Sequence, residues 1–369
     1  MQGNISIMIK PASLNCNLRC DYCFYFDEAM KREFPDRGFM KEDTVRNLVS
    51  KSLMLGCSVS YMFQGGEPSL VGLDWFKRFI EIEEEYNTEG VEISHFFQTN
   101  GTNINKEWAV FFREHQFLVG VSYDGNNRVH DVHRRSAQGK KTGRDVSKAL
   151  AILEENKVDY NVLTVVTNAV AENPELVFDG LMSKGIEYQQ YLSCMDPLST
   201  DKTFLDPHKY GVFLVTLFDQ WVAALHQGYH VSIRLFDNFV SILCGYPPEA
   251  CDMLGNCSIQ YVVEGDGSMY PCDFYCMDEY CLGNINTDSF SDFDAKRRDI
   301  GFIERSLVKK DACIQCKYFN LCRGGCPRYR DAQTGMYHYC ESYTYLFDHR
   351  LEQFQALAAS LLKADKQNT

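Results

Sequence analysis

The first half of the chain alternates short apolar runs with longer amphipathic segments. The apolar runs are rich in Val, Ile, Phe and Tyr, and most end in polar or glycine-containing turns, which predicts β-strands. These runs are SIMIKPA (6–12), VSYMFQ (59–64), EISHFFQ (92–98), FLVGVSY (117–123), YNVLTVVT (160–167) and YQQYLS (188–193). The segments between them, such as 42–55 and 74–86, have helical periodicity. Six strand-then-helix units predict an α/β fold with a parallel sheet, in which chemistry gathers at the carboxyl ends of the strands.

The pattern changes after residue 200. Residues 201–245 read as a helical segment that contains a strand-like piece, VSIRLF, at 231–236. From 246 to 345 cysteines become dense and long apolar periodicity disappears, so this region has too little apolar core of its own and would need metal to hold it. The tail, 343–364, predicts one amphipathic helix that packs back on the protein. We therefore expect a barrel over 1–200, a helical linker over 201–245, a cysteine-rich domain over 246–345 and a C-terminal helix over 346–369.

Charge and cysteine content narrow the function classes. The formal net charge of −13 argues against nucleic acid as a partner, because phosphate binding needs a basic face. The N-terminal residues do not resemble a signal peptide and no stretch is long and apolar enough to span a membrane, so we expect a cytoplasmic protein. In a reducing compartment the 16 cysteines favour metal binding or catalysis over structural disulfides.

The stretch CNLRCDYC places Cys16, Cys20 and Cys23 at a C-x-x-x-C-x-x-C spacing. A zinc site usually has four protein ligands, and no fourth Cys or His is nearby. A redox pair needs only C-x-x-C, and three buried thiols without a function are the remaining simple interpretation. An iron–sulfur cluster with one iron left open accounts for all three thiols, because three thiolates on four irons leave one coordination position free.

This spacing, with an aromatic residue before the last cysteine and a place after the first strand, resembles the signature of the radical S-adenosylmethionine (SAM) enzymes. The resemblance implies a partial (β/α)6 barrel in which the open iron binds the amino and carboxylate groups of SAM. Reduction of the cluster then releases a 5′-deoxyadenosyl radical. GGEP, at 65–68 after the second strand, is where that family has its SAM-contacting glycines. The resemblance further implies SAM contacts from these residues: Tyr22, Gly65, Gly66, Glu67, Ser122, Arg134 and Met195.

A second cysteine field follows in the C-terminal region. The segment CIQCKYFNLCRGGC resembles the SPASM extension of some radical SAM enzymes, which binds two auxiliary [4Fe–4S] clusters. By that resemblance Cys251, Cys257, Cys272 and Cys326 hold one cluster, and Cys313, Cys316, Cys322 and Cys340 hold the other. Connectivity alone leaves this pairing open, and a pair of zinc ribbons is the alternative that the C-x-x-C spacing permits. Cys57, Cys194, Cys244, Cys276 and Cys281 are left over and are expected to be small apolar side chains.

Other stretches are similar to the anaerobic sulfatase-maturating enzymes over nearly the whole chain. They are KPAS, FQGGEPSL, FQTNGT, SIRLFD and GDGSMYPCDFYCMDEYCLGNI. The resemblance implies oxidation of a Cys or Ser in a sulfatase's C/S-x-P-x-R motif to Cα-formylglycine without oxygen. Asp273, next to Cys272, is the predicted base, and Tyr25, Gln64 and Arg234 are predicted substrate contacts. The HDVH stretch at 130–133 has metal-like spacing but is interpreted as a solvated loop.

The same resemblance implies a flavodoxin- or ferredoxin-type electron donor and a monomeric enzyme. Two other functions stay open at this stage. One is a radical SAM maturase that links or epimerises residues of a ribosomal peptide; such enzymes often carry an N-terminal peptide-binding extension, whereas this chain reaches its first strand within about six residues. The other is a zinc-stabilised binding protein without catalysis.

Overall fold

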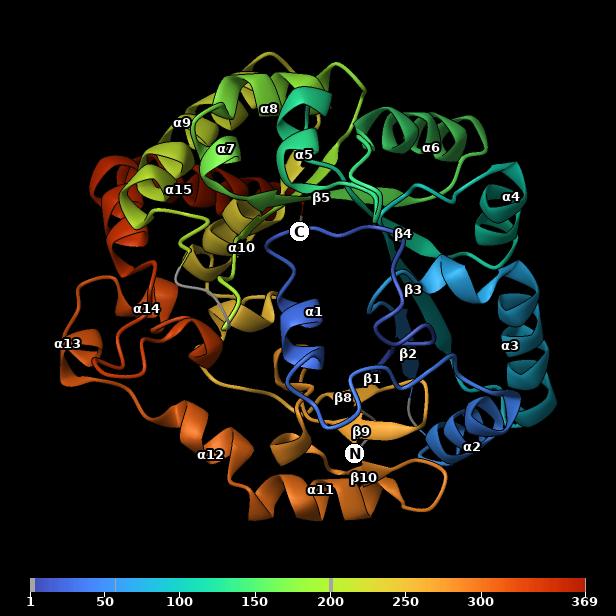
Figure 1. Cartoon of the computed structure of the whole chain (residues 1–369). Helices are drawn as coiled ribbons and strands as arrows, with labels where there is room; N and C mark the ends of the chain where they lie inside the picture. The colour runs from blue at the N-terminus through green and yellow to red at the C-terminus, as the bar shows by residue number, and fades with distance from the viewer. Residues whose placement is uncertain (1–3, 57, 199–201, 369) are drawn as a thin grey trace.

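The computed structural model describes residues 4–56, 58–198 and 202–368 (Figure 1). Within them a ten-stranded sheet has the order β10-β9-β8-β1-β2-β3-β4-β5-β6-β7. The strands are β1 (Ile5–Ile9), β2 (Val59–Phe63), β3 (Ile93–Thr99), β4 (Leu118–Ser122), β5 (Tyr160–Val166), β6 (Tyr188–Ser193), β7 (Ser232–Ile233), β8 (Tyr261–Val263), β9 (Ser268–Tyr270) and β10 (Gly283–Asn284). Each strand from β1 to β7 pairs in parallel with the next, which confirms the predicted parallel α/β sheet.

Helices surround this sheet, and α1 lies inside their ring (Figure 1). The helices of the first half are α1 (Phe24–Ala29), α2 (Glu42–Leu53), α3 (Leu73–Tyr86), α4 (Lys106–Glu114), α5 (Asn127–His133), α6 (Gly143–Glu155), α7 (Asn168–Ala171) and α8 (Pro174–Met182). Those of the second half are α9 (Pro207–His226), α10 (Arg234–Leu243), α11 (Phe290–Asp299), α12 (Phe302–Leu307), α13 (Asp311–Ile314), α14 (Phe319–Cys322) and α15 (Cys340–Asn368). Among the described residues, none of these helices is long and apolar enough to cross a membrane.

An aromatic core fixes the helices on the outer face of β2 and β3. In α3 the buried residues Phe76, Phe79 and Ile80 recur at helical spacing, as the sequence pattern predicted. The ring of Phe63 on β2 meets the rings of Phe76 and Phe79 edge to face, with 5.0 Å between centroids in each pair. This packing fixes the position of β2, and therefore the start of the loop that follows it.

Two parts of the second half differ from the predictions. VSIRLF does not form one strand: β7 ends at Ile233 and α10 begins at Arg234, so Arg234 lies on the first turn of a helix. The cysteine-rich region also adds three strands to the main sheet, because β8 pairs in parallel with β1 while β9 and β10 continue antiparallel. The sheet therefore crosses the domain boundary that we expected at residue 246.

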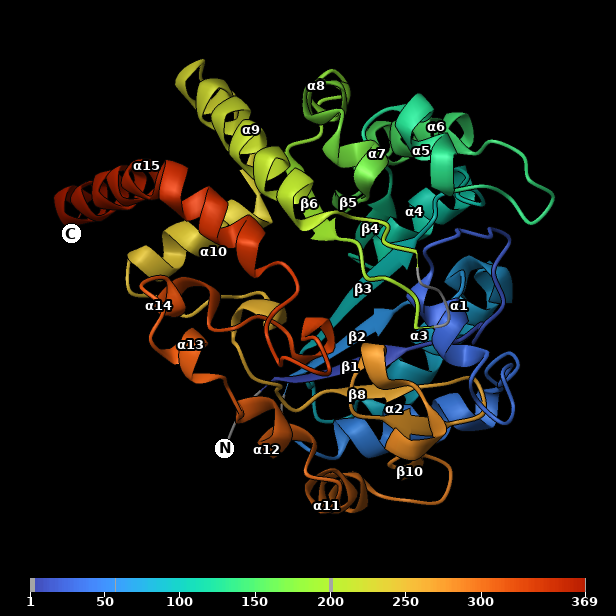
Figure 2. The same ribbon diagram turned by 60° about the vertical axis from the view of Figure 1, so that its left-hand side comes forward.

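The C-terminal helix packs back on the protein, as predicted, although α15 begins earlier, at Cys340. The ring centroid of its Phe354 lies 4.3 Å from that of Phe218 on α9. The ring centroid of its Phe347 lies 4.9 Å from that of Phe239 on α10. Figure 2 shows α9, α10 and α15 together on one side of the molecule. These contacts place the last of the second-field cysteines, Cys340, at the start of a helix anchored on the barrel side.

Candidate active site

The first three cysteines lie in the loop that follows β1, at the carboxyl end of the strand. Cys16, Cys20 and Cys23 all line a cavity of about 490 Å³, together with Gly65 and Gly66. Cys23 is also the N-cap residue of α1, where its sulfur accepts a hydrogen bond from Phe26 N at 3.4 Å. The loop thus places the three thiols on one wall of one cavity.

The GGEP segment supports this loop through its backbone. Gly66 N donates to Ser13 O at 2.9 Å, and Glu67 N donates to Asn15 O at 2.8 Å. A Cβ on Gly66 would lie 2.1 Å from Asn15 O, so only glycine allows this approach. The buried Glu67 carboxylate accepts from Thr99 Oγ1 at 2.8 Å and from Asn100 N at 2.8 Å. Its side chain therefore joins the loops after β2 and β3, while the glycines face the cavity.

The donor set fits a four-iron cluster with a bound SAM. Burial raises the pKa of Cys16 and of Cys20 to about 12, so these thiols release protons when they bind metal. The hydroxyl of Tyr22 is buried with no hydrogen-bond partner among the described residues, which leaves one polar atom for a ligand. The guanidinium of Arg134 lies 5.5 Å from the Tyr22 ring centroid.

Arg134 is held by an acidic residue that the sequence analysis did not single out. Its Nε donates to Asp124 Oδ2 at 3.0 Å, and both side chains are buried. Ser122 ends β4 and receives a 3.4 Å contact from Gln98 Nε2, and Met195 is buried in the loop after β6. Of the predicted SAM contacts, Gly65, Gly66 and Glu67 follow β2, Ser122 ends β4 and Met195 follows β6, whereas Tyr22 lies in the cysteine loop and Arg134 follows α5.

The HDVH stretch is not a solvated loop, contrary to our prediction. It lies in α5, and His130 is fully buried, with Nδ1 3.6 Å from Asp124 Oδ2 and Nε2 3.2 Å from Thr142 Oγ1. Burial lowers the pKa of His130 to about 4, although the neighbouring Asp124 raises it. His130 is therefore a neutral structural residue that packs against Asp124.

We expect acid to destabilise the protein through His130. The unfolded chain binds a proton below its pKa of 6.5, whereas the folded chain does not until about pH 4. Stability that is present above pH 6.5 is therefore lost as the pH falls through this window, by about 1.4 kcal/mol at pH 5.5. Urea unfolding at pH 7.5 and 5.5 measures the difference, and His130→Gln is the matched variant in which it should shrink. An equal pH dependence in the parent and the variant would contradict the assignment.

Asp273 lies in the short turn η3 (Asp273–Tyr275) and is buried. Its two carboxylate oxygens have different partners: Lys10 Nζ lies 2.5 Å from Oδ1, and Gln64 Nε2 donates to Oδ2 at 2.8 Å. Lys10 follows β1 and Gln64 follows β2, so both lie at the carboxyl ends of neighbouring parallel strands. Burial by itself lowers the pKa of Lys10, but the charges of Asp273, Cys276 and Glu264 raise it well above its usual range.

The predicted substrate contacts divide into two places. Tyr25 lines the cavity, and its hydroxyl donates to Glu264 Oε1 at 2.7 Å. Gln64 is the partner of Asp273. Gln64, Asp273 and Arg234 are not among the residues that line the cavity. The Arg234 guanidinium contacts Gln190 Oε1 at 3.2 Å and Glu249 Oε1 at 3.1 Å, not Asp273. Tyr25 and Gln64 therefore lie with Asp273, and Arg234 lies apart.

The second cysteine field forms two groups in space. Burial raises the pKa of Cys272, and the neighbouring Cys326 and Cys257 raise it further. Cys326 is affected in the same way by Cys257 and Cys251. These four are the set expected for one auxiliary cluster, and the structure brings them into one neighbourhood.

The other four cysteines, Cys313, Cys316, Cys322 and Cys340, also lie close to one another. Burial raises the pKa of Cys322 to about 11, with Cys340, Cys316 and Cys313 as additional causes. In the described residues no three His, Cys, Asp or Glu side chains are grouped to hold a single metal ion. A four-iron cluster is a different case, because each thiolate binds a different iron.

The leftover cysteines are dispersed. Cys194 and Cys276 are buried, Cys244 and Cys281 are half-buried, and Cys57 lies outside the described residues. Cys276 Sγ contacts Cys272 O at 3.6 Å and Cys281 Sγ contacts Gly283 O at 3.6 Å. These contacts are consistent with the packing part expected for them.

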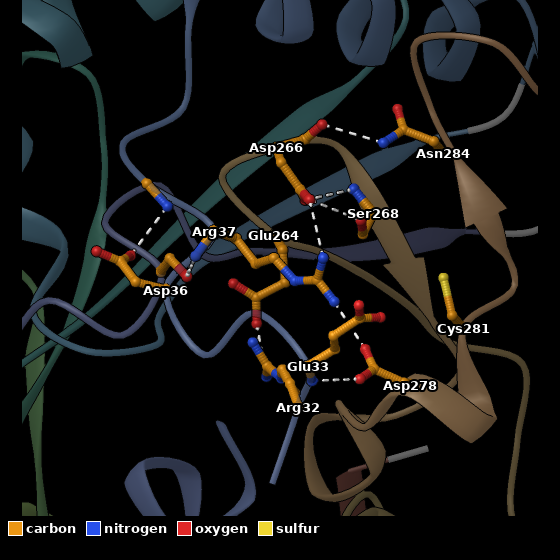
Figure 3. A network of polar contacts seen from close by, with 12 residues as sticks. Arg32, Glu33, Asp36, Arg37, Glu264, Asp266, Ser268, Asp278, Cys281 and Asn284 are labelled. Atoms are coloured by element: carbon orange, nitrogen blue, oxygen red, sulfur yellow. Dashed lines mark hydrogen bonds and ion pairs between the residues drawn. The ribbon is translucent and has the colours of Figure 1, made fainter. Parts of the chain in front are cut away.

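A polar network joins the segment after α1 to the cysteine-rich region (Figure 3). Arg32 Nη2 lies 3.0 Å from Glu264 Oε1, and both side chains have no exposed surface. Arg37 Nη2 lies 2.7 Å from Asp278 Oδ1, and Arg37 Nη1 lies 3.5 Å from Asp266 Oδ2. No sequence pattern indicated this network, and Lys10 was not among the predicted site residues. For Lys10 a signal existed, since it is a charged residue in the apolar run 6–12 that was predicted as the first strand.

Comparison with known proteins identifies the family. Residues 11–175 match the family model of the radical SAM superfamily. The chain is 38% identical over 367 residues to the cysteine-type anaerobic sulfatase-maturating enzyme of Clostridium novyi (strain NT), over 97% of this chain and 98% of that relative. It is 28% identical to the serine-type anaerobic sulfatase-maturating enzyme of Klebsiella aerogenes, over 96% of this chain and 87% of that relative.

A solved structure, native anSMEcpe with bound AdoMet and Cp18Cys peptide, has a TM-score of 0.91 and 36% identity to this chain, over 97% of this chain and 100% of that one. The fold and the three-cysteine loop define a radical SAM enzyme. More narrowly, the chain belongs to the family of anaerobic sulfatase-maturating enzymes.

Proposed function

We propose that this enzyme oxidises a cysteine in a sulfatase polypeptide to Cα-formylglycine without oxygen. The observation that carries the proposal is the convergence of two features at the strand ends. The three-cysteine loop lines the cavity, and the buried carboxylate of Asp273 is bound by Gln64, which directly precedes the cavity-lining Gly65. This arrangement can place a hydrogen-abstracting centre and a base on the same target side chain.

We assign the cofactors from the donor sets. Cys16, Cys20 and Cys23 would hold the SAM-binding [4Fe–4S] cluster, and the glycines of GGEP, Tyr22, Ser122, Arg134 and Met195 would contact SAM. When bound, the cluster and SAM supply the 5′-deoxyadenosyl radical that removes a hydrogen atom from the target Cβ. The two groups of four cysteines would hold the auxiliary clusters, Cys251, Cys257, Cys272 and Cys326 in one and Cys313, Cys316, Cys322 and Cys340 in the other.

The residues of the chain supply the proton chemistry. Loss of a hydrogen atom from Cβ, a proton from the thiol and one further electron converts the target into a thioaldehyde, and hydrolysis then gives the aldehyde and hydrogen sulfide. Asp273 accepts the thiol proton, and it is covalently next to Cys272, so the proton and the electron leave toward the same region. Tyr25 and Gln64 are placed to orient the target, and Arg234 would contact the peptide farther out.

The substrate we propose is a peptide with the C-x-P-x-R motif. Identity to the cysteine-type relative is 38%, compared with 28% to the serine-type relative, which favours cysteine as the target. The electron donor we propose is a flavodoxin or ferredoxin, and we expect the enzyme to act as a monomer in the cytoplasm.

Incubation of the reconstituted enzyme with SAM, dithionite and a C-x-P-x-R peptide is expected to give formylglycine and 5′-deoxyadenosine. Mass spectrometry would show the change from CH2SH to CHO at the target residue. A matched peptide with alanine in place of cysteine should stay unmodified. SAM cleavage with an unchanged cysteine peptide would reject the proposed substrate. A product that keeps its sulfur, has lost hydrogen and shows a new bond between two residues on fragmentation would indicate crosslinking instead.

A further inference from the structure

Lys10 is buried against the predicted base. It follows β1, has no exposed surface, and its Nζ lies 2.5 Å from Asp273 Oδ1. The two residues are 263 positions apart in the chain. An ammonium so close to a buried carboxylate makes a charge-assisted hydrogen bond, which is shorter and stronger than a bond between neutral groups.

The surroundings keep Lys10 in this position. Its Nζ lies 3.5 Å from the centroid of the Tyr25 ring, a cation–π contact, and the Tyr25 hydroxyl is in turn bound to Glu264. The backbone N–H of Lys10 donates to Val263 O on β8 at 2.8 Å. Lys10 is therefore held to the sheet through its backbone and to α1 through Tyr25. Its Nζ donates a hydrogen bond to Oδ1 of Asp273.

The turn that carries Asp273 is fixed at its other end. Arg32 Nε donates to Cys276 O. Arg32 Nη2 pairs with Glu264 Oε1 at 3.0 Å (Figure 3). The residues from Asp273 to Cys276 are thus held at both ends by cations from the barrel. Neither end of the turn can rotate without breaking a buried contact.

The second carboxylate oxygen has a different kind of partner. Oδ2 accepts a hydrogen bond from the amide of Gln64, which is neutral and only half-buried. A neutral amide is a weaker partner than a buried ammonium. A substrate thiol that enters from the cavity side would therefore displace Gln64 from Oδ2 before it could displace Lys10 from Oδ1.

We propose that Lys10 is a positioning residue that holds Oδ1 of Asp273, so that Oδ2 is the oxygen that accepts the substrate's thiol proton. Gln64 occupies Oδ2 in the free enzyme and gives way to the target cysteine. In this step the S–H bond breaks, an O–H bond forms at Oδ2, and Lys10 keeps its own proton. This inference rests on the proposed formylglycine-forming function.

The test compares Lys10→Met with the parent enzyme. We expect kcat for formylglycine to fall at least about tenfold, because a misplaced base transfers protons poorly. The KM for the peptide, the iron content and the reductive cleavage of SAM should stay close to the parent values. The ratio of 5′-deoxyadenosine to formylglycine should rise by about the same factor, because hydrogen abstraction continues without productive proton loss.

Three variants complete the design. Lys51→Met is the matched control, since Lys51 also joins the barrel to the cysteine-rich region, through Ile285 O and Asp288 O, but does not touch Asp273; it should keep the parental ratio. Lys10→Arg keeps the charge and should recover part of the lost rate. In the double variant with Asp273→Asn, Lys10→Met should cause no further loss.

Each other outcome is decisive. Parental kcat and product ratio in Lys10→Met would overturn the inference while leaving the proposed function intact. Loss of iron in Lys10→Met that Asp273→Asn restores would show that Lys10 only neutralises a buried charge. If the parent enzyme forms no formylglycine, the proposed function fails and the inference fails with it.

Discussion

Replacement of Cys20 by alanine is expected to abolish reductive cleavage of SAM. Cys20 lines the cavity, and Cys16 and Cys23 lie close enough to it that their charges raise the pKa of its thiol, after burial as the main cause. Without Cys20 only two thiolates remain to bind the cluster. No other His or Cys near them in the sequence can take the place of the lost ligand. No other group in the proposed mechanism delivers the electron, so 5′-deoxyadenosine should fall below detection rather than decrease by a factor.

The measurement is iron content and 5′-deoxyadenosine after anaerobic reconstitution. The parent should bind about twelve irons and Cys20→Ala about eight, if the two other cysteine groups each keep four. Cys244→Ala is the matched control, because Cys244 is half-buried at the end of α10 and its sulfur contacts Ala358 O. Parental SAM cleavage by Cys20→Ala would remove the basis for the proposed function.

Asp273→Asn is expected to lower the rate of formylglycine formation by about 10²- to 10⁴-fold, the usual contribution of a general base. Asparagine keeps the shape of the side chain but cannot take the thiol proton. The variant should still cleave SAM, since the cysteine loop is separate from Asp273. The number of 5′-deoxyadenosine molecules per formylglycine should therefore rise steeply.

The change also leaves Lys10 as a buried cation beside a neutral amide. Removing one partner of a buried ion pair destabilises a protein by about 3–5 kcal/mol. Iron content and thermal unfolding must therefore be measured with the rate, and Asp278→Asn is a matched control, because Asp278 lies in the same segment but is exposed and pairs with Arg37. A near-parental rate in cluster-loaded Asp273→Asn would show that another group is the base.

Local patterns predicted the elements of the first half well. β2, β5 and β6 lie within one residue of their expected bounds, because each is a run of β-favouring residues between turns. The strands β8, β9 and β10 were missed because they have three, three and two residues, too few for any periodicity to appear. Arg234 was assigned to a strand because Val, Ile and Phe surround it, and tertiary packing of α10 overrode that propensity.

The candidate site shows the same division. The spacing of Cys16, Cys20 and Cys23 and the sequence GGEP are each local features, but GGEP meets the cysteine loop only because β1 pairs with β2. The partner of Asp273 is not local. Lys10 meets it only because β8 pairs with β1 and brings the cysteine-rich region against the first strand. Nothing near either residue in the sequence indicates that contact.

By itself the sequence determined the parallel α/β architecture, the three-thiol loop and the residue types available for the chemistry, since these follow from periodicity and short spacings. Only the tertiary structure decided which charges are buried together. Lys10 with Asp273, Arg32 with Glu264 and Arg134 with Asp124 are each enclosed by other segments of the fold. A charge is stable in the interior only opposite its partner, and that pairing exists only once the strands have assembled.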